Sequence, residues 1–130
     1  MSDKRVVRSE RAPAPFQGAP YSQAIAAGGL VFVSGQLGLE PGETTLEHKG
    51  IEEQTRQVLE NLKAILEQAG SGLDRLLKTT VFLADLADFA AMNGVYAEYV
   101  GAVPPARATV QVAALPSGAL VEIDAVALSE

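Results

Sequence analysis

The chain has 130 residues, 48% of them apolar and 20% charged, which fits one globular domain and not a disordered or fibrous chain. It contains no cysteine, so disulfides, thiol catalysis and thiolate metal sites are excluded, and a reducing compartment, the cytoplasm, is favoured. A net charge of −6 argues against nucleic-acid binding, which needs clustered lysine and arginine.

The N-terminal segment carries four of the ten basic side chains, interleaved with Asp3 and Glu10: Lys4, Arg5, Arg8 and Arg11. A basic arm or a transit peptide is one interpretation of this pattern. A solvated first strand around Val6 and Val7 is the interpretation we favour. No apolar run approaches the roughly 18 residues that a membrane span requires, so we expect no membrane partner.

Turn-forming residues divide the next part of the chain. Residues 12–24 are rich in proline and glycine and predict an ordered loop. Gly28-Gly29, between two apolar runs, predicts a tight hairpin whose second strand covers Leu30 to Ser34. A polar loop follows over residues 39–50.

Residues 51–69 have the clearest helical pattern. Their apolar and small side chains recur at spacings of three and four, with charge on the opposite face: Ile51, Thr55, Val58, Leu59, Leu62, Ile65, Leu66 and Ala69. Gly70 follows, and a glycine at this position can end the helix by adopting a left-handed backbone conformation. A second helix begins near Asp85 or Asp88, either of which can cap it, and ends at Gly101.

Residues 76–84 predict a strand that is apolar on both faces and therefore buried on both. Alternation assigns Leu77, Val81 and Leu83 to one face, and Leu76, Phe82 and Ala84 to the other. Two more strands, over residues 104–112 and 119–128, are separated by a turn at Pro116-Ser117-Gly118.

This order of elements predicts an α+β fold with a mixed sheet of five to six strands, in one domain over residues 1–130. Two helices cover only one face of such a sheet. The other face carries Val, Leu and Phe as well as polar groups, so we expect a second copy of the chain to cover it.

Most kinds of catalytic and cofactor site are not indicated. His48, the only histidine, lies in the polar loop without a nucleophile elbow or metal-ligand spacing around it, and we interpret it as a solvated loop residue. The sequence "GGLVFVSG" does not have the order of a phosphate-binding loop. We therefore expect no metal and no cofactor.

Two charged residues stand inside apolar strands: Arg107 in "PPARATVQV" and Glu122 in "ALVEIDAV". Alternation separates Arg107, Thr109 and Gln111 from the apolar positions of that strand, and we assign Arg107, Glu122 and Asp124 to the sheet face that the helices leave uncovered. Three interpretations are open: a structural ion pair, charges exposed to water at the edge of the sheet, or a ligand site at a subunit boundary. In the last case Arg107 presents a rigid fork for a carboxylate, and Glu122 acts as an acid or base.

The stretch "PARATVQVAALPSGALVEI" resembles the C-terminal signature of the RidA/YjgF/UK114 family. The resemblance continues, in the same order, through "GAPYSQA", "VFVSGQLG", "QTRQVLENLKAILEQAG" and "LLKTTVFLADLADFAAMNGVYAEY". It covers nearly all of residues 13–128.

The resemblance implies a chorismate-mutase-like subunit that forms a homotrimer around a central β-barrel, with clefts between subunits. It implies cofactor-independent hydrolysis of 2-iminobutanoate and 2-iminopropanoate to 2-oxo acids and ammonia. A non-catalytic, metabolite-binding regulator is the alternative. A ribonuclease activity, which some family names carry, fits poorly with the acidic charge.

The resemblance also implies roles for particular residues. Arg107 matches the arginine that binds the substrate carboxylate, and Glu122 matches the glutamate that assists the water. Five further residues match cleft-lining positions: Tyr21, Ser34, Gly35, Phe89 and Asn93. Thr109 stands where many members have cysteine, so any role that needs a thiol is excluded.

Overall fold

The computed structural model describes residues 3–129, which form a six-stranded sheet with the order β1-β2-β3-β6-β4-β5. Neighbouring strands are antiparallel except β4 and β5, which are parallel. The elements are β1 (Arg5–Val7), β2 (Ala24–Ala27), β3 (Leu30–Gln36), α1 (Ile51–Gln68), β4 (Leu76–Leu83), α2 (Phe89–Val100), β5 (Ala106–Gln111) and β6 (Val121–Leu128). The expected α+β fold is confirmed, and the expected domain of residues 1–130 extends at both ends beyond the described part.

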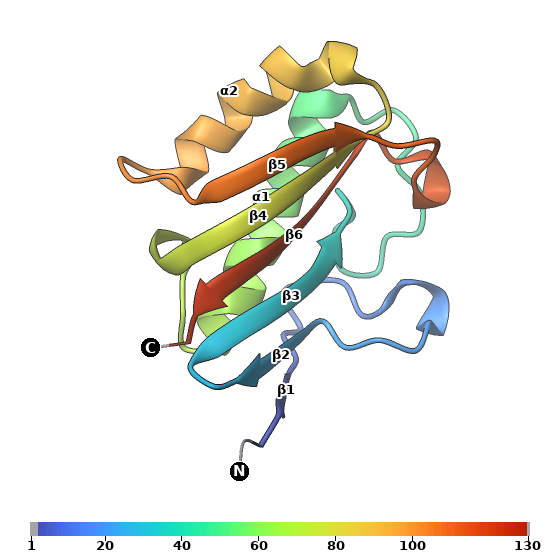
Figure 1. Cartoon of the computed structure of the whole chain (residues 1–130). Coiled ribbons are helices and arrows are strands. Elements are labelled where there is room, and N and C mark those ends of the chain that lie inside the picture. The colour runs from blue at the N-terminus through green and yellow to red at the C-terminus, as the bar shows by residue number, and fades with distance from the viewer. Residues whose placement is uncertain (1–2, 130) are drawn as a thin grey trace.

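Both helices lie on one side of the sheet (Figure 1), as the sequence predicts. Helix α1 packs on β3 and β6, and α2 packs against α1. The apolar stripe of α1 enters the core, where Leu59, Leu62 and Ile65 are completely buried. Gly70 ends the helix region with a φ of 81°, a conformation that glycine adopts without strain.

Several local predictions are confirmed. Gly28 and Gly29 form the hairpin between β2 and β3, with φ values of 60° and 80°. The second strand is longer than expected and reaches Gln36. Helix α2 begins directly after Asp88, but the Asp88 side chain makes no capping hydrogen bond. Asp85 instead caps the short 3₁₀ turn over Leu86–Asp88, where its side chain accepts from the backbone N–H of Ala87.

The predicted faces of β4 are partly wrong. A register shift between Leu76 and Lys78 changes the alternation at the start of the strand. Leu76 is therefore buried with Val81 and Leu83, whereas Leu77, which we assigned to that face, is 42% exposed. The strand is also not buried on both sides, since Phe82 is only half-buried.

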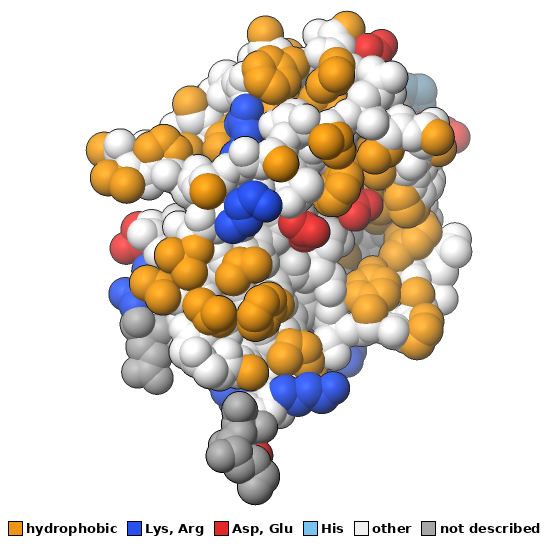
Figure 2. Space-filling view, viewed as in Figure 1, with side chains coloured by type: hydrophobic (Ala, Val, Ile, Leu, Met, Phe, Trp, Pro, Cys, Tyr) orange, Lys and Arg blue, Asp and Glu red, His pale blue; other side chains and the backbone are white. Residues whose placement is uncertain are grey.

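The other face of the sheet is uncovered in the single chain. Figure 2 shows apolar side chains gathered on this face, and its exposed members include Val6, Phe32, Val110 and Leu128. An apolar sheet face of this kind is typical of an interface between protein chains. Within residues 3–129, no helix has the length and apolarity of a membrane span.

Candidate functional site

The residues singled out from the sequence fall into two separate groups. Four of them, which we call the Glu122 group, line a cavity at the edge of the uncovered face: Tyr21, Ser34, Gly35 and Glu122. The other four, which we call the Arg107 group, lie on α2 and on the edge strand β5 and do not line that cavity: Phe89, Asn93, Arg107 and Thr109. One chain therefore does not bring all eight residues together.

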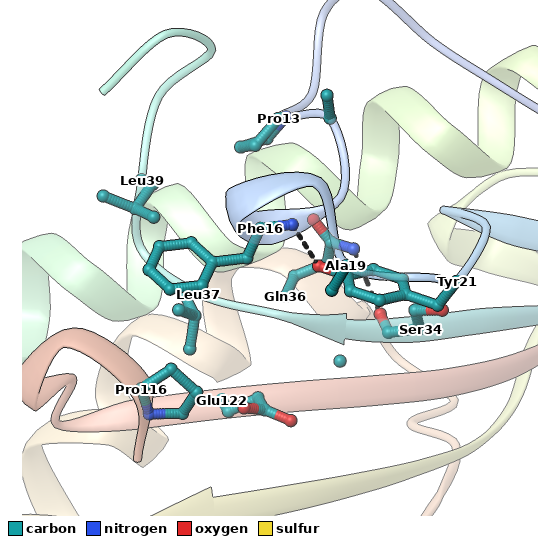
Figure 3. A pocket seen from close by; sticks show the side chains of 12 residues that line it. Pro13, Phe16, Ala19, Tyr21, Ser34, Gln36, Leu37, Leu39, Pro116 and Glu122 are labelled. Atoms are coloured by element: carbon teal, nitrogen blue, oxygen red, sulfur yellow. Dashed lines mark hydrogen bonds between the residues drawn. The ribbon is translucent and has the colours of Figure 1, made fainter. Parts of the chain in front are cut away.

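The cavity has a volume of about 420 Å³ and is open to solvent (Figure 3). Besides the Glu122 group and Gln36, its lining is made of apolar and small residues from the loop before β2, the segment after β3 and the turn before β6: Pro13, Ala14, Phe16, Ala19, Leu37, Leu39 and Pro116. Glu122 is the only charged residue in this lining. The cavity thus combines one ionisable group with a largely apolar wall.

Gly35 makes the space that the Glu122 carboxylate occupies. The register of β3 against β6 shifts between Val33 and Gln36, and this irregularity brings Gly35 beside Glu122. A Cβ atom on Gly35 would lie 2.8 Å from the Cδ of Glu122, closer than side chains approach. Any larger residue at this position would therefore displace the Glu122 carboxylate from the place that it occupies.

Burial raises the pKa of the Glu122 carboxyl, and the nearby Asp124 carboxylate raises it further. Both side chains lie on the uncovered face, as predicted, because Asp124 pairs with Thr80 and Glu122 with Phe82. A carboxyl with a raised pKa keeps its proton at a higher pH than an ordinary glutamate does, and this suits it to proton transfer.

Hydrogen bonds fix the polar side of the cavity. The Tyr21 hydroxyl accepts a bond of 2.6 Å from the backbone N–H of Phe16, and the Ser34 hydroxyl donates one of 2.6 Å to the Ser22 carbonyl. The Gln36 amide donates to the Ser34 carbonyl at 3.1 Å. Tyr21 and Ser34 are thereby held in place before any ligand binds.

The guanidinium of Arg107 packs on the aromatic rings of α2. Its Cζ atom lies 4.8 Å from the centroid of the Tyr96 ring and 5.6 Å from that of Phe89. Tyr96 is buried, and its hydroxyl shares a hydrogen bond of 2.6 Å with the hydroxyl of Thr79 on β4. These contacts hold a planar cation at the edge of the sheet, in a position where it can receive a carboxylate.

This geometry corrects the face that we assigned to Arg107. Residues paired in parallel strands point to the same side, and Arg107 pairs with Thr79, which is completely buried under the helices. Arg107 and Thr109 therefore face the helix layer, and the alanines and valine of β5 face the uncovered side. Alternation separates the two faces of an edge strand correctly but does not say which one the helices cover.

Arg107 and Glu122 do not form a structural ion pair within one chain. Arg107 and Glu122 point to opposite faces of the sheet, and no ion pair found within residues 3–129 includes either of them. Both charges remain available for a ligand.

Asn93 and Thr109 lie beside Arg107 on the helix side. Thr109 pairs with the buried Val81 and is half-buried. The Oδ1 atom of Asn93 is buried without a hydrogen-bond partner, which is an unfavourable arrangement for a side-chain amide. An acceptor in this state is suited to a ligand that donates a hydrogen bond.

Sequence reasoning missed Thr79 and Tyr96 as supports of Arg107. The signal for Tyr96 was present, because Phe89, Asn93 and Tyr96 stand at helical spacings of four and three and hence on one face of α2. His48 lies exposed in the loop after β3, as expected. Within the described residues, no group of three or more histidine or carboxylate side chains is arranged to hold a metal ion.

The chain resembles known proteins over almost its whole length. Residues 10–129 match the family model described as Endoribonuclease L-PSP. Reactive Intermediate Deaminase A, chloroplastic, from Arabidopsis thaliana is 50% identical over 124 residues, which are 95% of this chain and 65% of the plant protein. The 2-iminobutanoate/2-iminopropanoate deaminase of Capra hircus is 43% identical over 125 residues, 96% of this chain and 90% of that protein. The crystal structure of E. coli TdcF with bound serine superposes with a TM-score of 0.87 at 39% identity, covering 95% of this chain and 98% of that one.

Proposed function

Because the chain belongs to the RidA/YjgF/UK114 family, whose model is described as Endoribonuclease L-PSP, we propose that it is a 2-iminobutanoate/2-iminopropanoate deaminase. The observation that carries this proposal is the Glu122 carboxyl. Its pKa is raised, and it is the only charged residue in the lining of a largely apolar cavity. Deaminases of the same name, such as the goat protein, share 43% of their residues with it.

The complete site lies between two subunits of a homotrimer, with the Glu122 group from one chain and the Arg107 group from the next. Two features support this arrangement. The two groups face opposite sides of the sheet, so one chain cannot offer both to a small ligand. The uncovered apolar face also requires another chain against it.

The reaction needs one water and one proton carrier. Arg107 binds the carboxylate of the imino acid through its two parallel N–H groups and orients the C=N bond. Glu122 accepts a proton from the water as its oxygen bonds to the imine carbon, and it passes this proton to the nitrogen, which gives a carbinolamine. The same carboxylate then takes the proton of the carbinolamine hydroxyl and delivers it to the nitrogen as the C=O bond forms and the C–N bond breaks, so that ammonia and a 2-oxo acid leave. No cofactor takes part in these steps.

The test couples the protein to a threonine dehydratase that acts on threonine. We expect 2-oxobutyrate to appear faster when the protein is present, and this gain to disappear with Arg107→Ala. Equal rates with and without the protein would contradict the proposal.

A metabolite-binding regulator without turnover is the second candidate, because E. coli TdcF was solved with bound serine. The same cleft would serve, and Arg107 would still be required. Calorimetric binding of serine or 2-oxobutyrate, together with no acceleration of imine hydrolysis, would favour this candidate over the deaminase.

A further inference from the structure

The pairing between β3 and β6 stops one residue short of Glu122. Its last pair joins Ile123 on β6 to Gln36, the residue at which β3 ends. We propose that Gln54 on α1 takes over from β3 at this point and is a positioning residue that holds Glu122 at the cavity. The consequence for catalysis rests on the deaminase function proposed above.

The side-chain amide of Gln54 binds the backbone just before Glu122. Its Oε1 atom accepts a hydrogen bond of 2.9 Å from the N–H of Leu120, and its Nε2 atom donates one of 2.9 Å to the carbonyl of Lys49. Gln54 is only 2% exposed, so water does not compete for these bonds. An amide that accepts and donates in this way offers the bonding groups of a peptide unit, and it can therefore replace one beside a strand.

The backbone of Leu120 is also held on its other side. Its carbonyl accepts a hydrogen bond of 3.0 Å from the N–H of Ala84, which follows β4. Glu122 lies about 7 Å further along the extended chain. Loss of the bond to Gln54 would therefore free the start of β6 on one side and move the carboxyl that this strand carries.

Gln54 also contacts the segment that forms the opposite wall of the cavity. Leu37 and Leu39 line this wall, and Gly38 lies between them. A Cβ atom on Gly38 would lie 2.7 Å from the Cα of Gln54, closer than side chains approach. The Nζ atom of Lys49 donates to the Gly38 carbonyl at 3.2 Å, which ties the same segment to the start of α1. Gln54 thus sets the spacing between the two segments that border the cavity.

These contacts do not depend on a second chain. They lie within one chain, at the helix that covers one side of the sheet, whereas the proposed site receives its second chain on the uncovered face. Gln54 does not line the cavity itself. It acts on Glu122 through the backbone and does not touch a ligand.

The neighbouring residue on α1 provides a matched control. Thr55 is completely buried, and its hydroxyl donates a hydrogen bond of 2.7 Å to the carbonyl of Ile51. This bond stays within the helix and reaches neither wall of the cavity. Thr55→Val keeps the shape of the side chain and removes the bond, so it reports what the loss of a buried hydrogen bond in α1 does without a link to Glu122.

The test measures steady-state kinetics of Gln54→Met on 2-iminobutanoate that a threonine dehydratase supplies. The variant keeps the length of the side chain but makes neither hydrogen bond. We expect kcat to fall at least about tenfold, because a small displacement of the proton carrier is costly. KM should change less than about threefold, because Arg107 of the next chain still binds the substrate carboxylate. Thr55→Val should leave both constants unchanged.

A shorter amide gives a second variant. Gln54→Asn draws the amide back by one methylene, so it cannot reach Leu120 and Lys49 together. We expect kcat to fall at least about threefold. If Gln54→Met does not fold, full kcat in Gln54→Asn would overturn the inference by itself.

A measurement without turnover follows the Glu122 carboxyl directly. Its titration is recorded by carbon-13 NMR, and its signal is assigned with Glu122→Gln. Burial and the Asp124 carboxylate raise the pKa of this carboxyl above 4.5. If Gln54→Met lets the carboxyl move toward water, this pKa should fall toward 4.5, whereas Thr55→Val should leave it unchanged.

The outcomes separate this inference from the function on which it rests. If the parent protein does not accelerate imine hydrolysis, the deaminase function is wrong, and an unchanged titration in Gln54→Met would show that the positioning role is wrong as well. If the parent is active and Gln54→Met keeps its kcat, the deaminase function stands and the positioning role is wrong. An equal fall in kcat for Thr55→Val would also overturn the inference, because any weakening of α1 would then suffice.

Discussion

The guanidinium of Arg107 lies over the ring of Tyr96, 4.8 Å from its centroid, and the Tyr96 hydroxyl is joined to that of Thr79 by a hydrogen bond of 2.6 Å. The cation is thus held against an aromatic ring that is itself hydrogen-bonded to β4. This chain of contacts holds the guanidinium beside α2. A planar fork of N–H groups matches the two oxygens of a carboxylate.

The first prediction concerns the shape of this cation. Arg107→Lys keeps the charge but replaces the fork with a point charge, so we expect kcat/KM for 2-iminobutanoate to fall at least about tenfold. Steady-state kinetics at saturating and limiting substrate measure the effect. A lysine variant with full turnover would show that the bidentate contact is not needed.

The second prediction separates the ring of Tyr96 from its hydroxyl. Tyr96→Leu removes the cation–π contact, which is worth about 0.5–2 kcal/mol. The variant should therefore raise KM by about tenfold, with a smaller change in kcat. Tyr96→Phe keeps the ring and leaves the buried Thr79 hydroxyl unpaired, so it should cost about 1–3 kcal/mol of folding free energy but affect KM less.

Denaturant unfolding and kinetics on the same two variants measure both effects. If Tyr96→Phe and Tyr96→Leu raise KM equally, the ring does not position Arg107, and Tyr96 has only a structural role.

The third prediction is a dependence on pH. The folded state raises the pKa of Glu122 above the ordinary value of 4.5, so it favours the protonated carboxyl. This favourable contribution to stability is complete below 4.5 and is lost as the pH rises through the folded pKa. Glu122→Gln, which is never charged, should therefore be more stable than the parent at pH 7, and the difference should disappear as the pH falls below 4.5.

The same variant tests catalysis. Losing the proton carrier should reduce kcat about 10²- to 10⁴-fold and abolish the acid limb of the pH–rate profile. Thermal melts from pH 4 to 8, with kinetics over the same range, measure both effects. A Glu122→Gln variant that is less stable than the parent at pH 7 would show that its carboxylate has a favourable partner.

The helices and strands of this fold can be predicted closely from the sequence, but the positions of the site residues relative to one another cannot. Local signals suffice for the Gly28-Gly29 hairpin and for α1, because paired glycines and a periodic apolar stripe act within a few residues. The register shift at Leu76 depends on how β4 pairs with β6, which no local pattern contains. The side of Arg107 likewise depends on pairing with β4 and on rings contributed by α2.

The resemblance to a family supplied the candidate site residues from motifs, but not the way in which one chain divides them into two groups. That division follows from the direction of the side chains on β5 and β6, and hence from the sheet topology. For the same reason the apolar lining of the cavity was not predicted, since Phe16, Leu37 and Pro116 come from three separate segments.

The fourth prediction concerns the space at Gly35. Gly35→Ala places a methyl group against the Glu122 carboxylate, which must move. We expect kcat/KM to fall at least about tenfold because the proton carrier is displaced. Gly94→Ala is the matched control, since a Cβ there on α2 meets no atom within 4 Å. It should leave kcat/KM unchanged and stabilise the fold by about 0.5–1 kcal/mol, because alanine favours a helix interior. Full activity in Gly35→Ala would mean that the carboxylate does not need its present position.

The last prediction tests whether each site uses two chains. Arg107 and Glu122 face opposite sides of one sheet, so Arg107→Ala and Glu122→Gln damage different halves of a shared cleft. Each variant alone should be nearly inactive. After the two are mixed, unfolded and refolded together in equal amounts, some clefts combine the intact Glu122 of one chain with the intact Arg107 of the next. In randomly assembled trimers about a quarter of the clefts are intact in this way, so we expect roughly a quarter of the parent activity per chain.

The control is the same pair of variants mixed without unfolding, in which activity should return only as fast as subunits exchange. A double variant carrying both substitutions should remain inactive after the same treatment. If co-refolded single variants stay as inactive as the double variant while forming oligomers of the parent size, each site lies within one chain, and the division of the site between subunits is wrong.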